Sequence, residues 1–177
     1  MEFIGVGLSD KMYDTITDKI LKSYPKACVL YIDQVKNDTL LEKYNKRKAS
    51  MESMRGEGVV KEMQLFHGTK YANIDSIATN GFITTLNKTS AFGIGTYFST
   101  SATYSKDFMD ADKTGVSYMF VCDVLIGKMV QGSSRTIIDS NMYDNAVDKM
   151  NSPGMYICPH DDMCFPKYLV AFHKKAV

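Results

Sequence analysis

The sequence has no surplus of charge of either sign. Its 177 residues include 21 basic and 20 acidic side chains, which gives a formal net charge of +1. The arginines are few, namely Arg47, Arg55 and Arg135, although arginine is the side chain that holds phosphate groups best. Domains that bind nucleic acids usually carry a strongly basic surface, so neither DNA nor RNA is an expected partner.

Cysteine and histidine are also scarce and scattered. The four cysteines are Cys28, Cys122, Cys158 and Cys164, and the three histidines are His67, His160 and His173. No pair has the C-x-x-C spacing of a zinc site. Three of the cysteines lie in apolar runs, where a thiol behaves as a small hydrophobic group. We therefore expect no metal, four reduced thiols and an intracellular protein.

Long apolar runs are missing as well. No stretch approaches the roughly 18 residues that a membrane-spanning helix needs, and residues 1–8 lack the basic start and the length of a signal sequence. The apolar fraction of 45% and the charged fraction of 23% are typical of a soluble globular protein. A chain of this length can bury about 70% of its surface around one core. We expect one soluble domain over residues 1–177, with no membrane partner.

The first part of the chain predicts two helices around a strand. Ser9 or Asp10 can cap the first helix, and Pro25 follows its end. The residues at helical spacing on its inner face are Met12, Ile16, Ile20 and Leu21. Residues 27–35 predict a strand. Asn37 or Asp38 can cap the second helix.

The second helix has an apolar and a basic face. Its inward residues would be Leu40, Leu41 and Tyr44. The basic run on the opposite face is Lys43, Lys46, Arg47 and Lys48. We interpret this run as a solvated helix face.

The rest of the chain shifts from helices to strands. Residues 71–79 predict a helix that ends at Asn80-Gly81, and residues 84–95 predict a long loop of the kind that forms lids or binding loops. A strand over 96–99 precedes a helix that Thr100 or Ser101 caps and that runs to about residue 108. The strands expected after it are a long, central one over 117–130 and, beyond a loop over 141–153, two closing ones over 155–158 and 168–173. Because strands dominate this half, we predict an α+β fold with antiparallel sheets.

The stretch around which the rest is organised is Gln64-Leu65-Phe66-His67-Gly68-Thr69. Leu65 and Phe66 are typical of the end of a buried strand. The glycine after His67 leaves the backbone accessible, so an imidazole and bare peptide groups could orient a polar small molecule there. On its own, His67-Gly68 also fits a strand end that runs into a turn.

Motifs further along the chain favour a binding site at His67-Gly68 over a simple turn. They are Phe92-Gly93-x-Gly95-x-Tyr97-Phe98-Ser99, then Ser105, and then Tyr156 with Phe165-Pro166-x-Tyr168-Leu169. In this order and spacing, over about residues 27–173, they resemble the catalytic domain of the poly(ADP-ribose) polymerase family, the diphtheria-toxin-like ADP-ribosyltransferases. The resemblance implies two packed, mainly antiparallel sheets flanked by helices. We expect no room for the helical regulatory subdomain found in that family.

The resemblance also implies NAD+ as co-substrate and assigns residues to its nicotinamide half. NAD+ breaks between nicotinamide and ribose through a transition state like that of glycoside hydrolysis. Gly68 would offer its N–H and C=O to the nicotinamide carboxamide, and Ser105 would donate its hydroxyl to the same group. Phe108 would stack on the cationic ring, and Tyr97 would form the opposite wall.

The adenosine half would be held by the residues around the histidine. His67 would hydrogen-bond a hydroxyl of the adenosine ribose and so position the dinucleotide. Thr69 and Asn73 are further candidate contacts on this side. The loop over residues 84–95 matches the donor-site loop of the family, which lies over NAD+.

The third catalytic position departs from the pattern of the polymer-building members, which carry a glutamate there. The spacing from Phe165-Pro166-Lys167-Tyr168-Leu169 places Met155 at this position. A thioether cannot activate a ribose hydroxyl for chain elongation, whereas a nucleophile on a target protein can still support a single transfer. The resulting triad of His67, Tyr97 and Met155 is similar to that of the mono-ADP-ribosylating branch, so we expect a protein acceptor, possibly the chain itself.

Several alternatives remain at this stage. The missing glutamate also fits a weak or inactive module that only binds NAD+ or ADP-ribose, and a related fold that modifies RNA fits the neutral charge poorly. Considered singly, Tyr97, Phe108 and Met155 could be core residues, and Ser105 could face solvent. The segment His160-Asp161-Asp162 is predicted to be a polar loop, with a metal or acid–base site as its alternative, and His173 is expected to be exposed.

Overall fold

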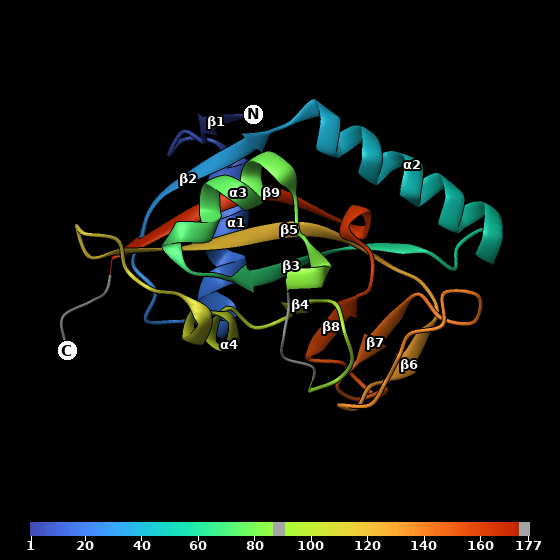
Figure 1. Cartoon of the computed structure of the whole chain (residues 1–177). Helices are drawn as coiled ribbons and strands as arrows, with labels where there is room; N and C mark the ends of the chain where they lie inside the picture. Colours follow the sequence, from blue (N-terminus) through green and yellow to red (C-terminus); the bar gives the residue numbers. More distant parts are fainter. Residues whose placement is uncertain (87–90, 174–177) are drawn as a thin grey trace.

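A computed structural model of the chain describes residues 1–86 and 91–173 and contains one hydrogen-bonded sheet in the order β1-β2-β9-β5-β3-β4-β8-β7-β6 (Figure 1). The strands are β1 (Glu2–Gly5), β2 (Val29–Lys36), β3 (Lys61–Gly68), β4 (Thr96–Ser99), β5 (Val116–Ile126), β6 (Met129–Gln131), β7 (Asn145–Val147), β8 (Met155–Cys158) and β9 (Cys164–His173). The α-helices are α1 (Lys11–Ser23), α2 (Asp38–Arg55), α3 (Ile74–Asn80) and α4 (Ala102–Ser105). Short 3-10 helices are η1 (Tyr71–Asn73), η2 (Thr84–Leu86), η3 (Lys106–Phe108) and η4 (Asp161–Met163). All pairings are antiparallel except β6 with β7, which confirms the predicted α+β class.

Both predicted N-terminal helices are present, with caps that explain where they start. The Asp10 carboxylate accepts a hydrogen bond from the Met12 N–H at 2.8 Å, and the Asn37 side chain accepts one from the Leu40 N–H at 3.2 Å. Each cap satisfies an amide that the helix itself leaves unpaired. Asn37 also donates to the carbonyl of Ala78, so the start of α2 is tied to the end of α3.

The inner faces of these helices match the prediction with two exceptions. Ile16 and Ile20 of α1 and Tyr44 of α2 are buried. Met12 and Leu41 are each 40% exposed, so their predicted inward placement is wrong. Leu41 lies one position beyond the stripe formed by Leu40 and Tyr44, and one residue turns the side chain by about 100° around a helix.

In the basic run of α2, Lys43 and Lys46 are exposed, as predicted, whereas Arg47 and Lys48 are half-buried; three of the four form ion pairs. Lys46 pairs with Glu42 within the helix at 2.7 Å. Arg47 contacts Asp162 of η4 at 2.7 Å, and Lys48 lies 3.5 Å from Glu62 of β3. This face therefore also connects α2 to the edge of the sheet.

Strand β5 is central, as predicted from its few polar residues. It pairs with β3 on one side and with β9 on the other. Its side chains alternate between two apolar clusters on opposite faces: Phe120 and Cys122 belong to one, and Met119 and Val121 to the other. Helices α2 and α3 contribute to the first cluster, and α1 to the second.

The long strand expected over residues 117–130 is in fact two strands, and this prediction is wrong in its C-terminal part. β5 ends at Ile126. The next two amides leave the ladder: the Gly127 N–H donates to the Asn145 side chain, and the Lys128 N–H donates to the Asp144 carboxylate at 2.7 Å. The chain then turns into β6, which pairs in parallel with β7.

The closing segment also differs from the expected loop and strands. The loop expected over residues 141–153 contains β7, whose three residues are buried. β8 spans the predicted residues, but β9 begins at Cys164, four residues earlier than expected. Pro166 lies beside a register shift in β9, where a residue without an N–H is tolerated in a sheet.

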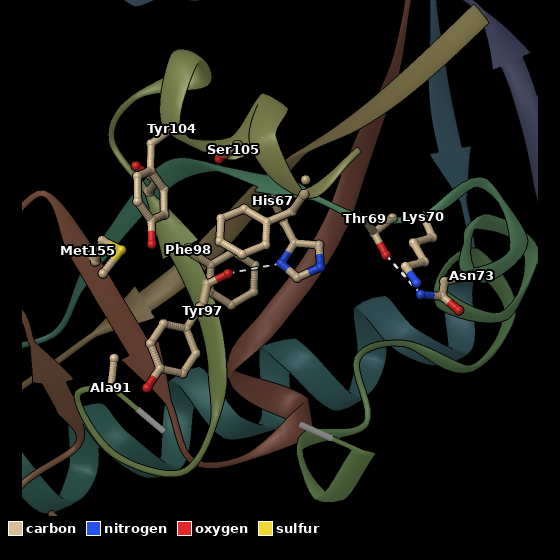
Figure 2. A pocket seen from close by; sticks show the side chains of 13 residues that line it. His67, Thr69, Lys70, Asn73, Ala91, Tyr97, Phe98, Tyr104, Ser105 and Met155 are labelled. Atoms are coloured by element: carbon tan, nitrogen blue, oxygen red, sulfur yellow. Dashed lines mark hydrogen bonds between the residues drawn. The ribbon is translucent and has the colours of Figure 1, made fainter. Parts of the chain in front are cut away.

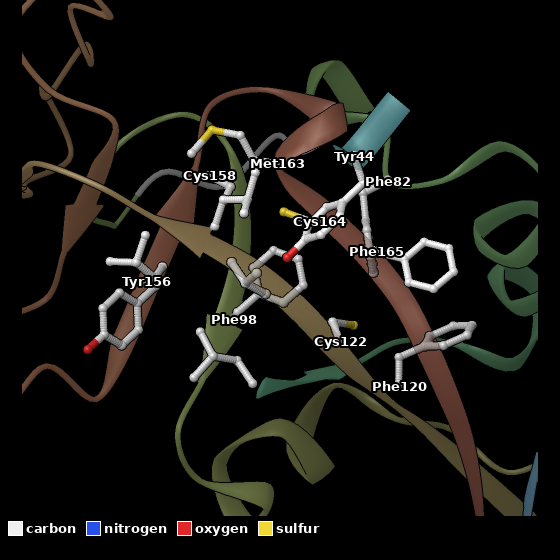
Figure 3. Close-up of a cluster of buried hydrophobic side chains, with 14 of the residues drawn as sticks. Tyr44, Phe82, Phe98, Phe120, Cys122, Tyr156, Cys158, Met163, Cys164 and Phe165 are labelled. Carbon is white, nitrogen blue, oxygen red and sulfur yellow. The ribbon is translucent and has the colours of Figure 1, made fainter. Parts of the chain in front are cut away.

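A single residue pair connects two parts of the sheet. β3 and β4 meet only at Phe66 and Ser99. We call β1, β2, β9, β5 and β3 the first half-sheet, and β4, β8, β7 and β6 the second half-sheet. Two packed sheets were expected, whereas the described residues form one continuous sheet whose two halves are joined by this pair. They share one core, in which Phe98 and Tyr156 of the second half-sheet lie in the same cluster as Phe120 and Cys122 of the first (Figure 3).

Two further features of the described residues concern the cysteines and the helices. All four cysteines are free thiols. Within residues 1–86 and 91–173, none of the helices combines the length and apolar character needed to cross a bilayer.

Candidate active site

One cavity of about 480 Å³ lies where the two half-sheets meet. Its lining includes all eight residues predicted from the sequence: His67, Gly68, Thr69, Asn73, Tyr97, Ser105, Phe108 and Met155 (Figure 2). The volume is within the usual range for small-molecule sites. The structure thus brings together residues that span 89 positions of the chain, while the role of each stays a prediction.

The single connection between the half-sheets explains how these residues meet. His67 and Gly68 follow Phe66 at the end of β3. Ser99, the partner of Phe66, also pairs with Met155 of β8. The cavity therefore takes one wall from each half-sheet, and α4 with η3 supplies a third.

Packing requires a glycine at position 68, independently of any ligand. A Cβ atom at this position would lie 1.7 Å from the carbonyl oxygen of Ser105. Only a glycine lets α4 approach the end of β3 this closely. The expectation that the missing side chain makes room for a bound molecule is thus incomplete, since the backbone of Ser105 already fills part of that space.

His67 is fixed in one tautomer. Its Nδ1 lies 2.9 Å from the carbonyl oxygen of Tyr97, which can only accept, so Nδ1 carries the proton and donates. The ring packs edge-on to Phe82 and tilted to Phe98, at centroid distances of 4.9 and 5.5 Å. Burial among these rings lowers the pKa of His67, although the bond to Tyr97 partly opposes the shift. The imidazole is therefore neutral at pH 7, with Nε2 as a hydrogen-bond acceptor.

The Tyr97 hydroxyl holds the loop that borders the cavity. It donates to the carbonyl of Gly93 at 2.7 Å and accepts from the N–H of Phe92 at 3.0 Å. The same loop packs closely on its neighbours, because a Cβ at Gly95 would lie 2.4 Å from the carbonyl oxygen of Cys158. The ring of Tyr97 lines the cavity as predicted, whereas its hydroxyl is engaged in the loop. Residues 87–90 of the predicted 84–95 loop lie outside the described residues.

Ser105 and Phe108 come from the short helical segment that Ser101 caps, as predicted. The Ser105 hydroxyl is buried and donates to the carbonyl of Phe66 at 3.3 Å, so in this structure its proton is engaged within the protein. Phe108 is 54% exposed at the rim. Its ring lies 5.4 Å from that of Tyr104, and the two rings form an aromatic edge beside the opening.

Met155 is held at the cavity by its backbone. The Asp148 carboxylate accepts hydrogen bonds from the N–H groups of Gly154 and Met155 at 2.9 and 3.1 Å. Asp148 itself does not line the cavity, and no acidic side chain does so among the described residues. The third position therefore carries no carboxylate, and neither does the described lining of the cavity.

A second hollow of about 290 Å³ adjoins the first. The two share His67, Thr69 and Asn73 in their linings. The Asn73 side chain donates to the Thr69 hydroxyl at 3.1 Å. A ligand with two bulky ends could thus extend past His67, with one end in each hollow.

The sequence prediction missed several lining residues. They are Lys70, Ala91, Phe98, Ser99 and Tyr104. Lys70 directly follows the Leu65-to-Thr69 motif, and Tyr104 precedes Phe108 by four positions, one helical turn, which places both rings on one face. These two could have been found by extending the motifs by one residue or one turn. Ala91 belongs to the predicted 84–95 loop, and Phe98 and Ser99 belong to the Phe92-to-Ser99 motif, although none of the three had a predicted role.

The predicted polar loop at His160-Asp161-Asp162 is a short turn in which His160 precedes η4 and the two aspartates begin it. Its three side chains diverge: His160 bonds Ser140, Asp161 accepts from the Thr84 N–H, and Asp162 pairs with Arg47. Across the described residues, no three histidine, cysteine, aspartate or glutamate side chains are grouped to hold a metal ion. His173 is exposed, as predicted.

Comparisons with known proteins agree with this geometry. Residues 11–166 match the family model of the poly(ADP-ribose) polymerase catalytic domain. Human protein mono-ADP-ribosyltransferase PARP14 is 27% identical over 178 residues, which cover 94% of this chain and 10% of that protein. Mouse protein mono-ADP-ribosyltransferase PARP12 is 30% identical over 179 residues, covering 96% of this chain and 25% of that protein. The chain thus spans a quarter or less of the length of these two relatives.

A shorter match points to a protein named differently. The probable inactive poly [ADP-ribose] polymerase SRO1 of Arabidopsis thaliana is 30% identical over 91 residues, or 48% of this chain. The family model nevertheless covers most of the chain, and the relatives named above confirm the resemblance predicted from the motifs. The chain belongs to the poly(ADP-ribose) polymerase catalytic-domain family, which consists of NAD+ ADP-ribosyltransferases, enzymes of the glycosyltransferase type.

Proposed function

We propose that this chain is a single intracellular catalytic domain that transfers one ADP-ribose unit from NAD+ to a protein side chain and releases nicotinamide. In this reaction a nucleophile of the acceptor bonds to the ribose carbon as the bond to nicotinamide breaks. The bonding electrons pass to the ring nitrogen of nicotinamide, which becomes neutral. The observation that carries the proposal is the meeting of all eight predicted residues, with Met155 among them, at one cavity.

The residues present fit a dinucleotide with two polar ends. A neutral His67 offers Nε2 to a ribose hydroxyl and cannot repel a cationic nicotinamide ring. The aromatic edge of Tyr104 and Phe108 suits that ring. Gly68, which has no side chain, and Ser105 both line the cavity. Holding both halves of NAD+ in one orientation lowers the entropic part of the barrier to transfer.

The absence of an acidic lining residue within the described part of the chain supports a single transfer. Extension of a polymer requires a base that activates a hydroxyl of the ADP-ribose already attached. Met155 has no proton-accepting oxygen or nitrogen. An acceptor that brings its own nucleophile, such as a carboxylate, does not need this help.

The test is incubation of the purified protein with NAD+, with intact mass and released nicotinamide as readouts. We expect a gain of one ADP-ribose unit, or of a few units on separate residues, and loss of the gain in His67→Ala. Met155→Glu should leave the product free of ladders, because the acceptor side of the pocket has not been rebuilt. Long chains made by the wild-type protein would contradict the proposal.

A weak or inactive module that binds NAD+ or ADP-ribose is the second candidate. The observation that favours it is the same Met155, together with the match to a relative named as probably inactive. Calorimetric binding of NAD+ with no nicotinamide release from any acceptor would support this candidate over the transferase.

A further inference from the structure

Three tyrosine rings lie together on the first half-sheet, outside both hollows of the candidate active site. Tyr31 of β2 and Tyr118 of β5 each pair with Ala171 of β9, so their side chains share one face of the sheet. The small alanine between them lets the two phenols meet, and the Tyr31 hydroxyl donates to the Tyr118 oxygen at 3.4 Å. The ring of Tyr71, from η1, lies 5.6 Å from that of Tyr118. We call these three rings the tyrosine patch.

The tyrosine patch is exposed and at the same time ordered. Tyr31 and Tyr71 are 43% and 50% exposed, so a large part of both side chains faces solvent. The Tyr118 hydroxyl donates to the Asp112 carboxylate at 3.0 Å, which extends the hydrogen bonds from the rings to the neighbouring turn. Side chains that are already fixed lose little conformational entropy on binding. Tyrosine is enriched in protein–protein contacts partly for this reason.

Two carboxylates border the tyrosine patch. The Asp110 side chain accepts a hydrogen bond from the Tyr71 N–H at 2.5 Å, and Asp112 accepts one from the Tyr118 hydroxyl. Hydrogen bonds from Thr114 hold the pKa of Asp112 at about 2. This carboxylate is therefore ionised at any physiological pH.

The other charges near the rings are also mainly negative. In the bordering segments, residues 70–75 and 109–115, the charged side chains are Lys70, Asp75, Asp110, Asp112 and Lys113. Lys70 lines the main cavity instead. Asp75 is exposed and follows Tyr71 by four residues in consecutive helical segments, which places the two on one side. Three carboxylates thus stand against the single ammonium of Lys113, in a chain whose net charge is only +1.

Aromatic faces beside carboxylates suit an arginine side chain. Its guanidinium group is planar, stacks on aromatic rings and pairs with carboxylates. Nucleic acids and anionic lipid surfaces would be repelled by the same charges. We propose that the tyrosine patch is a docking surface for an arginine-containing segment of a partner protein. This inference is independent of the proposed function, because the patch lies outside the cavity in which transfer would occur.

The probe for the test is a blocked peptide of repeated Gly-Arg units, titrated into the full chain while NMR follows the signals of the tyrosine rings. We expect saturable shifts at Tyr31, Tyr71 and Tyr118. Exchange of each arginine for citrulline keeps the planar group but removes the charge, and should weaken binding about tenfold or more. Tyr71→Ala should weaken binding of the arginine peptide about threefold or more.

Tyr104 supplies the matched control, because it is 42% exposed but lines the main cavity. Tyr104→Ala should bind the arginine peptide like the wild type. Equal affinity in the wild type and Tyr71→Ala would overturn the inference, and so would equal losses in Tyr71→Ala and Tyr104→Ala. Equal binding of the citrulline peptide would overturn it as well.

A second pair of variants tests the charge without touching a ring. Asp110→Asn keeps an acceptor oxygen for the Tyr71 N–H and removes the charge, so it should weaken the arginine peptide about threefold. Glu57→Gln changes an exposed acid in the loop before β3 and should have no effect. Equal affinities in these two variants would contradict the role of the carboxylates. A wild-type protein that binds no arginine peptide would overturn the inference while leaving transfer from NAD+ untouched.

Discussion

The two half-sheets line one cavity but are stabilised by different interactions. In the first half-sheet, β2, β3, β5 and β9 have 8, 8, 11 and 10 residues. Their long ladders carry an apolar cluster on each face, with the Lys167–Asp123 ion pair between β9 and β5 and the Tyr44–Glu62 hydrogen bond as polar contacts beside them. In the second half-sheet, β4, β8, β7 and β6 have 4, 4, 3 and 3 residues, too few for backbone pairing alone to fix them.

Polar side chains complete the second half-sheet. Arg55, at the end of α2, contacts both carboxylate oxygens of Asp144 and donates to two loop carbonyls. Asp148 holds the start of β8, and the Tyr97 hydroxyl holds the loop before β4. The comparison shows that a site can have one wall defined by apolar packing and another by a few directed hydrogen bonds. Substitutions at those bonds should therefore act mainly on the second wall.

The largest effect is expected from Arg55→Met. The Arg55 and Asp144 side chains are only 10% and 7% exposed, so the substitution leaves a buried carboxylate without its cation. The free energy of unfolding should fall by about 3–5 kcal/mol, measured by urea denaturation. Lys46→Met, which breaks the exposed pair with Glu42, is the control and should cost under about 0.5 kcal/mol. Equal losses in the two variants would remove the distinction between directed and incidental ion pairs.

Gly68→Ala tests the joint between the half-sheets. The new methyl group would clash with the carbonyl oxygen of Ser105, and α4 would have to shift. We expect a loss of about 1–3 kcal/mol in stability and weaker nicotinamide binding, measured by thermal unfolding and calorimetry. Gly7→Ala is the control, because no atom lies within 4 Å of a Cβ there. Normal stability in Gly68→Ala would show that α4 moves freely.

Tyr97→Phe keeps the ring at the cavity and removes only the hydroxyl. Two hydrogen bonds to the loop are lost, at a cost of about 1–2 kcal/mol. Hydrogen exchange at the Phe92 amide should become faster, while β3 amides keep their protection. Tyr13→Phe in α1 serves as the control. Unchanged exchange at Phe92 would mean that the glycine contacts alone fix the loop.

The smallest effect concerns pH and lies in the first half-sheet. The pKa of His67 is lowered from the ordinary 6.5 by burial, so the unfolded chain takes up a proton there before the folded one does. The stability contributed by neutral His67 is present above pH 6.5 and declines as the pH falls below that value. The difference in unfolding free energy between wild type and His67→Gln should be constant from pH 8 to about 6.5 and should change only as the pH falls from there to 5.

The sequence predicts the strands of the first half-sheet better than those of the second. Most first half-sheet strands have apolar runs or alternation and were placed within a few residues. The adjacent apolar residues Val121 and Cys122, for example, indicate a strand buried on both faces, and both are buried. β6 and β7 could not be recognised as separate strands from the sequence, because a strand of three residues is too short to show a periodic pattern. Their positions depend on Asp144 and Asn145, which bind backbone groups far away in the sequence.

The site residues were found for a different reason. A motif such as His67-Gly68-Thr69 has no periodicity, so only its order and spacing relative to Tyr97 and Ser105 gave it meaning. What the sequence could not supply was the state of each group, such as the bond of His67 to Tyr97 or that of Ser105 to Phe66. These follow from contacts between segments more than 25 residues apart.

The contact between Gly68 and Ser105 also bears on how such motifs should be used to judge activity. Because the main chain of α4 occupies the place of a side chain at position 68, a descendant that no longer turned over NAD+ would still need this glycine to fold. His67 is held by one hydrogen bond and two ring contacts, so its replacement would cost some stability but would not meet the main-chain clash that a side chain at position 68 meets. In this fold, an intact glycine is therefore a marker of architecture, and the histidine before it is the more informative sign that chemistry has been kept.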